Sequence, residues 1–226
     1  MTDDRTTRND ETEGLEAAKR VSRRWPLVSA SVALLLALSL GAIILIRGNL
    51  PFEGEAEWME EIIEHRSPVW EVPALAMDFL GGGWFAFALP GAIVIVLCVL
   101  RRFWSALFLG GASIVSALAV QLLKDVFGRP RPLDMLVTAD FGSFPSGHSA
   151  NAATLAVCLG LILWRTWVWI AGACYVLLMM LSRTYLGAHW VTDTVGGLLL
   201  GAAIALILWA PLAHKLRLES SHRERR

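Results

Sequence analysis

The chain has 226 residues, of which 55% are hydrophobic and ten are tryptophan. Soluble domains average about 45–50% apolar residues on a count that includes glycine, and the excess here lies in long runs, so the composition predicts a polytopic membrane protein. The formal net charge is zero, and neither a basic surface nor a binding motif points to nucleic acid. The three cysteines lie inside apolar runs without metal-binding or redox spacing, so they are interpreted as packing residues and no zinc or disulfide site is predicted.

Residues 1–22 are rich in charged residues and threonine, which predicts a disordered cytoplasmic tail. The apolar stretch from Pro26 to Ile46 follows Arg23 and Arg24 and is long enough for a membrane-spanning helix. A cleaved signal peptide is the alternative, since residues 37–42 include small side chains. The run exceeds the ~7–15 residues of a signal-peptide core, which favours a retained anchor.

The next segment, residues 47–72, is acidic. Trp58, Met59, Ile62 and Ile63 fall at helical spacing within it, with glutamates on the other side. This pattern predicts a short extracytoplasmic amphipathic helix on the membrane surface. A loop element that covers the bundle is the alternative, and the role of the segment stays open.

The rest of the chain predicts five further spans and an all-α bundle. Asp78 and the glycines at 81–83 interrupt the second apolar run, and the fourth span is the shortest. With the first helix, the expected six-span domain covers residues 23–213, and a basic cytoplasmic tail covers 214–226. The five later spans are Trp84–Leu100, Phe103–Leu123, Ser149–Trp164, Trp167–Leu181 and Thr194–Leu212.

The arginines predict the topology, because short cytoplasmic loops are enriched in Lys and Arg. In a six-span arrangement, Arg23 and Arg24, Arg101 and Arg102, Arg165 and the C-terminal basic tail fall on one side. We therefore expect a multi-pass plasma-membrane protein with both termini in the cytoplasm. The acidic segment and all polar motifs would then share the extracytoplasmic side.

Three polar blocks stand out against the apolar runs: residues 124–132, 145–148 and 182–193. Charged and histidine side chains are costly at a membrane boundary, so such clusters are functional-site hypotheses by default. Fixed cations suit the binding of a phosphate ester, and imidazoles suit nucleophilic and acid–base work.

His189 and Asp193 are four residues apart, one turn on a helix expected to start near Gly187. The carboxylate could then accept a hydrogen bond from one ring nitrogen and leave the other as a nucleophile. The turn at Pro145 to His148 precedes an apolar helix, where backbone N–H groups form an anion site and His148 could act as a general acid. Taken singly, an ordinary interfacial pair and a capping turn with an incidental histidine are the alternatives.

Lys124, Arg131 and Arg183 are candidates for binding phosphoryl oxygens, with arginine suited to bidentate contacts. The alternative is that these cations lie at helix ends and extend to the membrane surface. That alternative fits Arg129 better than Arg131, and the role of Arg129 stays open.

Together the motifs resemble the type 2 phosphatidic acid phosphatase superfamily. The pattern is Lys-x6-Arg-Pro, then Pro-Ser-Gly-His, then Ser-Arg-x5-His-x3-Asp, with no departure at any motif position. The matching residues are Lys124, Arg131 and Pro132; Pro145, Ser146, Gly147 and His148; and Ser182, Arg183, His189 and Asp193.

The resemblance implies a metal-independent phosphatase without a cofactor, acting on a lipid phosphate or diphosphate in the bilayer. His189 would attack phosphorus to form a phosphohistidine, Asp193 would orient it, and His148 would protonate the leaving group. The phosphoryl oxygens would be bound by Lys124, Arg131, Ser146, Gly147, Ser182 and Arg183. Undecaprenyl diphosphate is the favoured substrate, with phosphatidic acid and phosphatidylglycerol phosphate as alternatives, and the oligomeric state stays open.

Other functions share parts of this pattern. A lipid-to-lipid phosphotransferase would use the same site with a different acceptor. Vanadate-dependent haloperoxidases share the motifs but are soluble, so the six expected spans argue against them. A non-catalytic anion transporter would place its polar residues near the bilayer midplane, whereas here they lie at the ends of the apolar runs.

Overall fold

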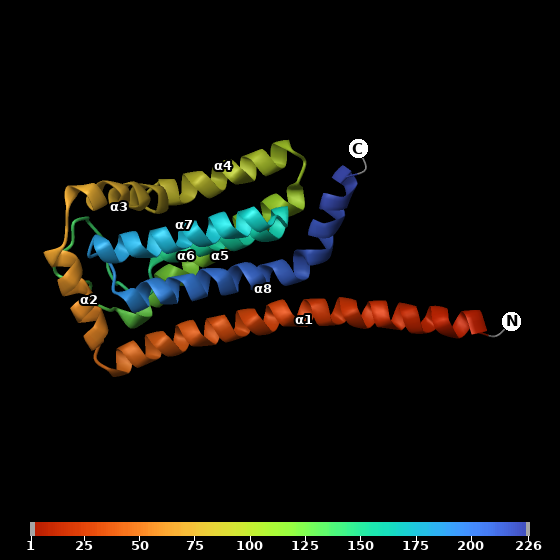
Figure 1. Ribbon diagram of the computed structural model, residues 1–226, viewed down its shortest axis with the longest axis horizontal. Coiled ribbons are helices and arrows are strands. Elements are labelled where there is room, and N and C mark those ends of the chain that lie inside the picture. Colours follow the sequence, from red (N-terminus) through yellow and green to blue (C-terminus); the bar gives the residue numbers. More distant parts are fainter. Residues whose placement is uncertain (1–2, 225–226) are drawn as a thin grey trace.

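The computed structural model describes the backbone of residues 3–224 and the side chains of residues 24–219. Within that range the chain is a bundle of helices, with α2 lying across one end and the others running along its length, except that the last part of α8 bends away at the other end (Figure 1). The helices are α1 (Asp3–Ile46), α2 (Glu53–Glu64), α3 (Pro68–Gly81), α4 (Phe85–Val99), α5 (Phe103–Phe127), α6 (Gly147–Leu163), α7 (Thr166–Tyr185) and α8 (Val191–Glu224).

Four of these helices are long and apolar enough to cross a bilayer: α1 from Arg24, α5, α7 and α8 to Glu219. Helices α3 and α4 pass the same test only together, and they are bent by 58° at a short break. Helix α6 has 17 residues, which at about 1.5 Å per residue is somewhat less than the ~30 Å hydrocarbon core. The structure therefore supports a membrane protein with four or five apolar spans, and the count of six stays a prediction.

The N-terminal predictions concern segments that the structure describes in part. The tail at residues 1–22 falls on residues whose side chains lie outside the described range, so its disorder stays a prediction. A helix does form in the acidic segment, and α2 buries Met59 together with Glu55. Its position on the membrane surface stays a prediction.

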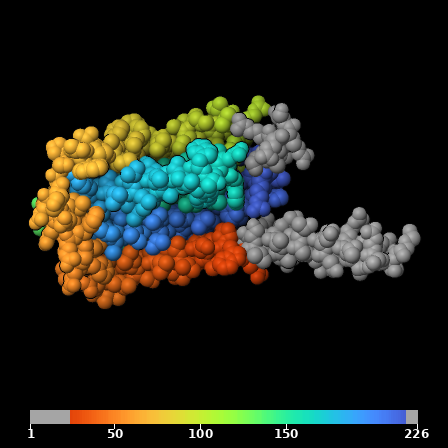
Figure 2. Space-filling view, viewed as in Figure 1, coloured from red at the N-terminus to blue at the C-terminus, as the bar shows by residue number. Residues whose placement is uncertain are grey.

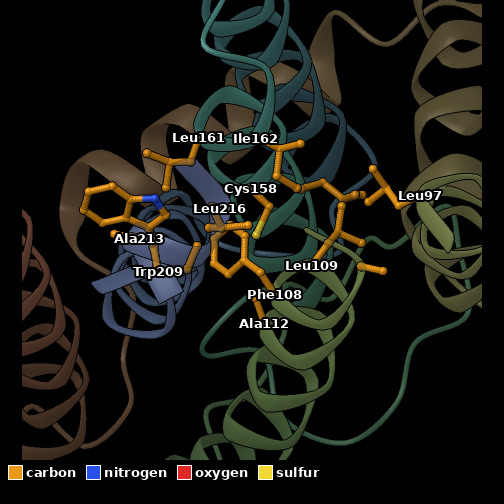
Figure 3. Packing of buried hydrophobic residues seen from close by; sticks show 13 residues of the cluster. Leu97, Phe108, Leu109, Ala112, Cys158, Leu161, Ile162, Trp209, Ala213 and Leu216 are labelled. Atoms are coloured by element: carbon orange, nitrogen blue, oxygen red, sulfur yellow. The ribbon is translucent and has the colours of Figure 1, made fainter. Parts of the chain in front are cut away.

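Helix α6 lies at the centre of the bundle, in contact with α5, α7 and α8, while α1 packs against the outer side of α8. The largest buried apolar cluster of the bundle includes Leu97, Phe108, Cys158, Ile162 and Trp209 (Figure 3). The approach of α8 to α6 is close because α8 carries glycine there. A Cβ atom on Gly201 would lie 2.2 Å from the Ala150 carbonyl oxygen.

Large apolar side chains cover the outer faces of the bundle. Ile95, Ile114, Leu118 and Leu177 are each more than half exposed, and α1, α7 and the α3–α4 pair lie side by side with α8 on one face (Figure 2). In a membrane these side chains face lipid, where the helices satisfy their own backbone hydrogen bonds.

The end of the bundle opposite α2 is held by polar contacts. The Glu219 carboxylate accepts hydrogen bonds from the Trp104 and Ser105 amides at 2.9 and 3.1 Å, at the start of α5. Arg102 donates to the Ile162 carbonyl near the end of α6 at 3.2 Å. The α4–α5 and α6–α7 connections and the last part of α8 therefore meet at one end, and the polar motifs lie at the other ends of these helices.

Candidate active site

The three motifs converge on one cavity of about 750 Å³ between α3, α4, α5 and α6. One part of its lining is polar, and the rest is apolar, with aromatic residues from the α3–α4 pair and aliphatic residues from α4 and α5. The charged residues and histidines of the lining are Asp78, Lys124, Arg131, Asp140, His148, Arg183 and His189. Both motif histidines and three motif cations thus line a space of the size usual for ligand pockets, about 300–1,000 Å³.

His189 lies in the loop between α7 and α8, with 2% of its surface exposed. Its Nδ1 is 2.8 Å from the Ser143 carbonyl oxygen, and its Nε2 is 3.2 Å from Arg131 Nη1. A carbonyl can only accept and a guanidinium can only donate. The ring is therefore neutral, with its proton on Nδ1 and its lone pair on Nε2, beside Arg131 at the cavity.

The charge surroundings keep the ring in that neutral form. Burial lowers the pKa of His189 well below its usual value, and the positive charge of Arg131 lowers it further. A desolvated imidazole beside a fixed cation loses its proton readily. His189 consequently has an unprotonated Nε2 at neutral pH, as a nucleophile requires.

The expected helix start near Gly187 is wrong, because α8 begins at Val191. Gly187 has a φ of +66°, a left-handed conformation that glycine adopts without steric cost and that cannot continue a helix. His189 and Asp193 therefore do not share a helical turn, and Nδ1 lies 3.7 Å from Asp193 Oδ2. The ring donates to the Ser143 carbonyl instead, and the orienting role of Asp193 stays a prediction.

Asp193 is held by a buried cation from the first motif. Arg129 Nη1 lies 2.6 Å from Asp193 Oδ1, and Arg129 Nη2 lies 2.8 Å from Glu55 Oε2. Arg129 is completely buried, so the interpretation of this arginine as a cation that extends to the membrane surface is wrong. The Asp193 charge must be compensated inside the protein, since a buried unpaired carboxylate is very costly.

Glu55 is satisfied on both of its oxygens. Oε2 also accepts from the Phe52 amide at 3.0 Å, and Oε1 accepts from the amide and hydroxyl of Thr192 at 2.8 and 2.5 Å. Glu55 thereby joins the start of α2 to the start of α8. Nothing in the sequence distinguishes it from the other glutamates of the acidic segment.

Lys124 and Arg131 share a carboxylate from the loop between the first two motifs. Lys124 Nζ lies 2.8 Å and Arg131 Nη2 2.7 Å from Asp140 Oδ1. Burial raises the pKa of Asp140, but the hydrogen bond and charge of Lys124 and the charge of Arg131 bring it below the usual value. Asp140 is therefore ionised at neutral pH and offsets part of the positive charge of the cavity.

Arg183 and His148 meet a second carboxylate, Asp78 on α3. Arg183 Nη1 donates to Asp78 Oδ1, and His148 Nε2 lies 3.2 Å from the same oxygen and 3.1 Å from the Asp78 carbonyl. The sequence offered one signal for Asp78, since it is a single acid inside an apolar run. No comparable signal marked Asp140.

Two predicted phosphate-binding residues lie outside the cavity lining. Ser146 is the N-cap of α6 and is fully buried, where its hydroxyl accepts from the Ser149 hydroxyl at 3.2 Å. The Ser182 hydroxyl donates to the Met179 carbonyl at 2.9 Å within α7. Gly147 does line the cavity, together with the three motif cations. Direct phosphate contacts from Ser146 and Ser182 stay predictions.

Among residues 24–219, the side chains close enough to share a metal ion are Glu61, Glu64 and His65, which lie exposed on α2. The polar groups of the cavity do not form such a cluster within the described part of the chain. The donors that face the cavity are mainly cations and imidazoles, which suit an anion.

The fold and the site define a helical membrane protein with a cationic, histidine-containing cavity at one end of its bundle. Residues 105–215 match the model of the PAP2 superfamily. The chain belongs to this superfamily, in agreement with its three motifs and with its relatives.

Two curated relatives and one solved structure illustrate the likeness. The chain is 38% identical over 78 residues to an undecaprenyl-diphosphatase of Sulfolobus acidocaldarius, a match that covers 34% of each chain. It is 34% identical over 132 residues to a decaprenylphosphoryl-5-phosphoribose phosphatase of Mycobacterium tuberculosis, covering 56% of this chain and 70% of the relative. The fold resembles that of a transmembrane PAP2-type phosphatidylglycerolphosphate phosphatase from Bacillus subtilis, with a TM-score of 0.70, 26% identity and coverage of 80% and 94%.

The match spans about a third of the length of the Sulfolobus relative. The names of these relatives concern three different phosphorylated lipids, so they agree on a class of chemistry and differ on the substrate.

Proposed function

We propose that the protein is a metal-independent lipid phosphate phosphatase that forms a phosphohistidine on His189. The observation that supports this proposal is the geometry of that ring, because its Nδ1–H is bound to the Ser143 carbonyl and its Nε2 lone pair lies at the cationic cavity. A nucleophile beside fixed donors is the arrangement that phosphoryl transfer requires, since its catalysis is mainly positioning and charge stabilisation.

In the first step, the His189 Nε2 lone pair forms a bond to phosphorus. The P–O bond to the lipid breaks, its electron pair goes to the leaving oxygen, and that oxygen takes a proton from His148. Lys124, Arg131 and Arg183 stabilise the charge of the phosphoryl oxygens. In the second step, water gives a proton to His148 and its oxygen attacks phosphorus, the P–N bond breaks, and inorganic phosphate leaves with His189 restored.

The substrate we propose is a lipid phosphate or diphosphate, with an isoprenoid diphosphate favoured. The cavity supports this choice because its polar part continues into apolar walls formed by Phe79, Phe85, Phe87, Val94 and Ile114. A phosphate headgroup can bind the cations while its hydrocarbon chain stays in an apolar environment. The undecaprenyl-diphosphatase among the relatives favours the isoprenoid carrier.

We further propose that the site faces the extracytoplasmic side of the plasma membrane, with both termini in the cytoplasm. Arg101 and Arg165 lie in the α4–α5 and α6–α7 connections, at the bundle end opposite the motifs. Positive residues mark cytoplasmic loops. Labelling of single cysteines introduced at Asp134 and at Arg165 with a membrane-impermeant maleimide in intact cells tests this, and labelling of the Arg165 site alone contradicts it.

The function is tested by lipid phosphate turnover of the purified protein with and without EDTA. We expect His189→Ala to abolish phosphate release and His214→Ala, an exposed histidine on the last part of α8, to leave it unchanged. Protein quenched in alkaline detergent should carry ³²P from labelled lipid when His189 is present, and the label should be stable to alkali and lost in acid. Full activity of His189→Ala, or loss of wild-type activity on chelation, contradicts the proposal.

A panel of lipid substrates then identifies the headgroup. Undecaprenyl diphosphate, phosphatidic acid and phosphatidylglycerol phosphate are compared at equal surface concentration. Recovery of the label in a second lipid instead of inorganic phosphate would identify a phosphotransferase with the same site.

A further inference from the structure

The α3–α4 pair contributes a carboxylate to the cavity from outside all three motifs. Asp78 lies one turn before the end of α3, and it is also outside residues 105–215, which match the family model. It lines the cavity together with His148 and Arg183, which belong to the second and third motifs.

The contacts of Asp78 determine which nitrogen of His148 carries a proton. His148 Nε2 lies 3.2 Å from the Asp78 carboxylate and 3.1 Å from the Asp78 carbonyl oxygen. An ionised carboxylate and a carbonyl both accept hydrogen bonds only. Nε2 therefore carries a proton, and Asp78 and His148 both line the cavity in which a leaving group would bind.

The main chain at the break between α3 and α4 is shaped around the same ring. A Cβ atom on Gly82 would lie 2.4 Å from His148 Nε2, which is far closer than non-bonded atoms approach. Gly82 itself has an ordinary extended conformation, with a φ of −124°, so its turn does not require glycine. The small residue is needed for the close approach of the ring.

We propose that Asp78 is a positioning residue for the general acid of this enzyme: it holds the proton on Nε2 of His148 and fixes the orientation of the ring. This inference rests on the proposed function. When the P–O bond breaks, the leaving oxygen replaces Asp78 as the acceptor of the Nε2 proton, and the neutral ring remains against Gly82. The acid is the imidazolium form of His148, with a proton on each ring nitrogen, and the negative charge of Asp78 stabilises this form before transfer, as a carboxylate beside histidine does in other acid–base pairs.

A different role for Asp78 would be to balance the charge of Arg183, to which it is also bonded. The two roles predict different dependence on the leaving group. A general acid matters for an alkoxide or phosphate leaving group that needs a proton, and little for a nitrophenolate, which leaves without one. Loss of charge balance at Arg183 would instead change the binding of every phosphoryl group to a similar extent.

The experiment measures the first step alone, as the single-turnover rate of phosphohistidine formation by the full-length protein in detergent, and compares a lipid phosphate with p-nitrophenyl phosphate. The second step, in which His148 accepts a proton from water, is the same for both substrates. We expect Asp78→Asn to lower this rate for the lipid by about 10- to 100-fold, which is less than the full ~10²–10⁴ that a general acid contributes because His148 remains, and to lower the rate for the aryl phosphate by less than about threefold. His148→Ala should show the same selectivity in this first step more strongly, and it should slow the common second step for both substrates. Glu71→Gln, which removes a carboxylate from the same helix, serves as the matched control and should change neither rate.

Gly82→Ala gives a second and independent test, because its methyl group displaces the ring from the Asp78 carbonyl. Gly82→Ala should lower the rate for the lipid and leave the rate for the aryl phosphate nearly unchanged. Gly111→Ala on α5 is the control and should change neither rate, because a Cβ atom there meets no neighbouring atom within 4 Å. Turnover of the aryl phosphate reports on correct folding in every variant.

Two outcomes separate this inference from the proposed function. In the first outcome, His189→Ala abolishes both activities, and Asp78→Asn either reduces both equally or reduces neither. The phosphatase assignment then stands, and the role of Asp78 is overturned. If His189→Ala leaves both activities intact, the proposed function fails, and the role of Asp78 fails with it.

Discussion

Replacement of Glu55 by glutamine should destabilise the protein strongly, although the two side chains have nearly the same shape. In the native protein Glu55 accepts four hydrogen bonds, from Arg129, from the Phe52 amide and from the amide and hydroxyl of Thr192. Arg129 is completely buried, so water cannot replace a lost partner.

The magnitude follows from the contacts that glutamine cannot make. The charge-assisted hydrogen bond to Arg129 contributes about 1.5–3 kcal/mol, and an amide NH₂ that faces another donor costs about 1–3 kcal/mol more. The sum, about 2.5–6 kcal/mol, includes the ~3–5 kcal/mol found when one partner of a buried ion pair is removed, and the narrower range is used below. For a chain of this size each kcal/mol corresponds to about 2–4 °C, so we expect the unfolding midpoint to fall by roughly 6–20 °C.

The assay is thermal unfolding of the purified protein in detergent, with Glu57→Gln as the control. Glu57 is exposed on the same helix, so its replacement removes the same charge without breaking the buried network. Similar midpoints for the two variants would refute the reasoning and would mean that Asp193 alone compensates Arg129. The shift for Glu55→Gln should also change little between low and high salt, since buried pairs are screened weakly.

Three further predictions concern the site and the helix packing. The acid limb of kcat/KM should lie below pH ~6.5, the usual pKa of histidine. The lowered pKa of His189 keeps its ring neutral, so activity is lost only as the pH falls through that pKa. An acid limb above pH ~6.5 in the pH–rate profile contradicts this prediction. Asp140→Asn should tighten the inhibition constant for inorganic phosphate by about three- to tenfold, since one opposing charge near an anion site is worth about 1 kcal/mol, whereas Asp134→Asn in the same loop should leave it unchanged. Gly201→Ala should lower the free energy of unfolding by about 1–3 kcal/mol or more, a usual cost of overpacking, because the new methyl group would meet the Ala150 carbonyl. An unchanged melting temperature would contradict this and would show that α8 can move away from α6.

The general architecture could be predicted because it depends on local patterns. Apolar runs of span length gave the helices, and the order of charged and histidine residues gave the cavity-lining residues Lys124, Arg131, His148, Arg183 and His189. The ends of the elements were less predictable. The start of α8 depends on the left-handed conformation of Gly187, and the periodicity of residues 187–193 does not reveal it.

The sequence did not reveal which charged residues pair with one another across the fold. Arg129 differs from Arg131 by two positions, yet it is buried against Asp193 and Glu55 whereas Arg131 faces the cavity. Which of the two points inward depends on helices more than 60 residues away in the chain. The partners of Asp78 and Asp140 were missed for the same reason, since an acid is recognisable as the partner of a cation only once the fold brings the two together, although the position of Asp78 inside an apolar run did mark it as unusual.

The cavity joins fixed charges to apolar walls within one space, and this has a kinetic consequence for an enzyme whose substrate is a lipid. A molecule that enters while its hydrocarbon chain remains in the bilayer is encountered by diffusion in two dimensions, so its effective concentration is a mole fraction in the membrane. Diluting the substrate with inert phospholipid at constant total substrate should therefore slow turnover, while diluting the whole suspension with buffer should not.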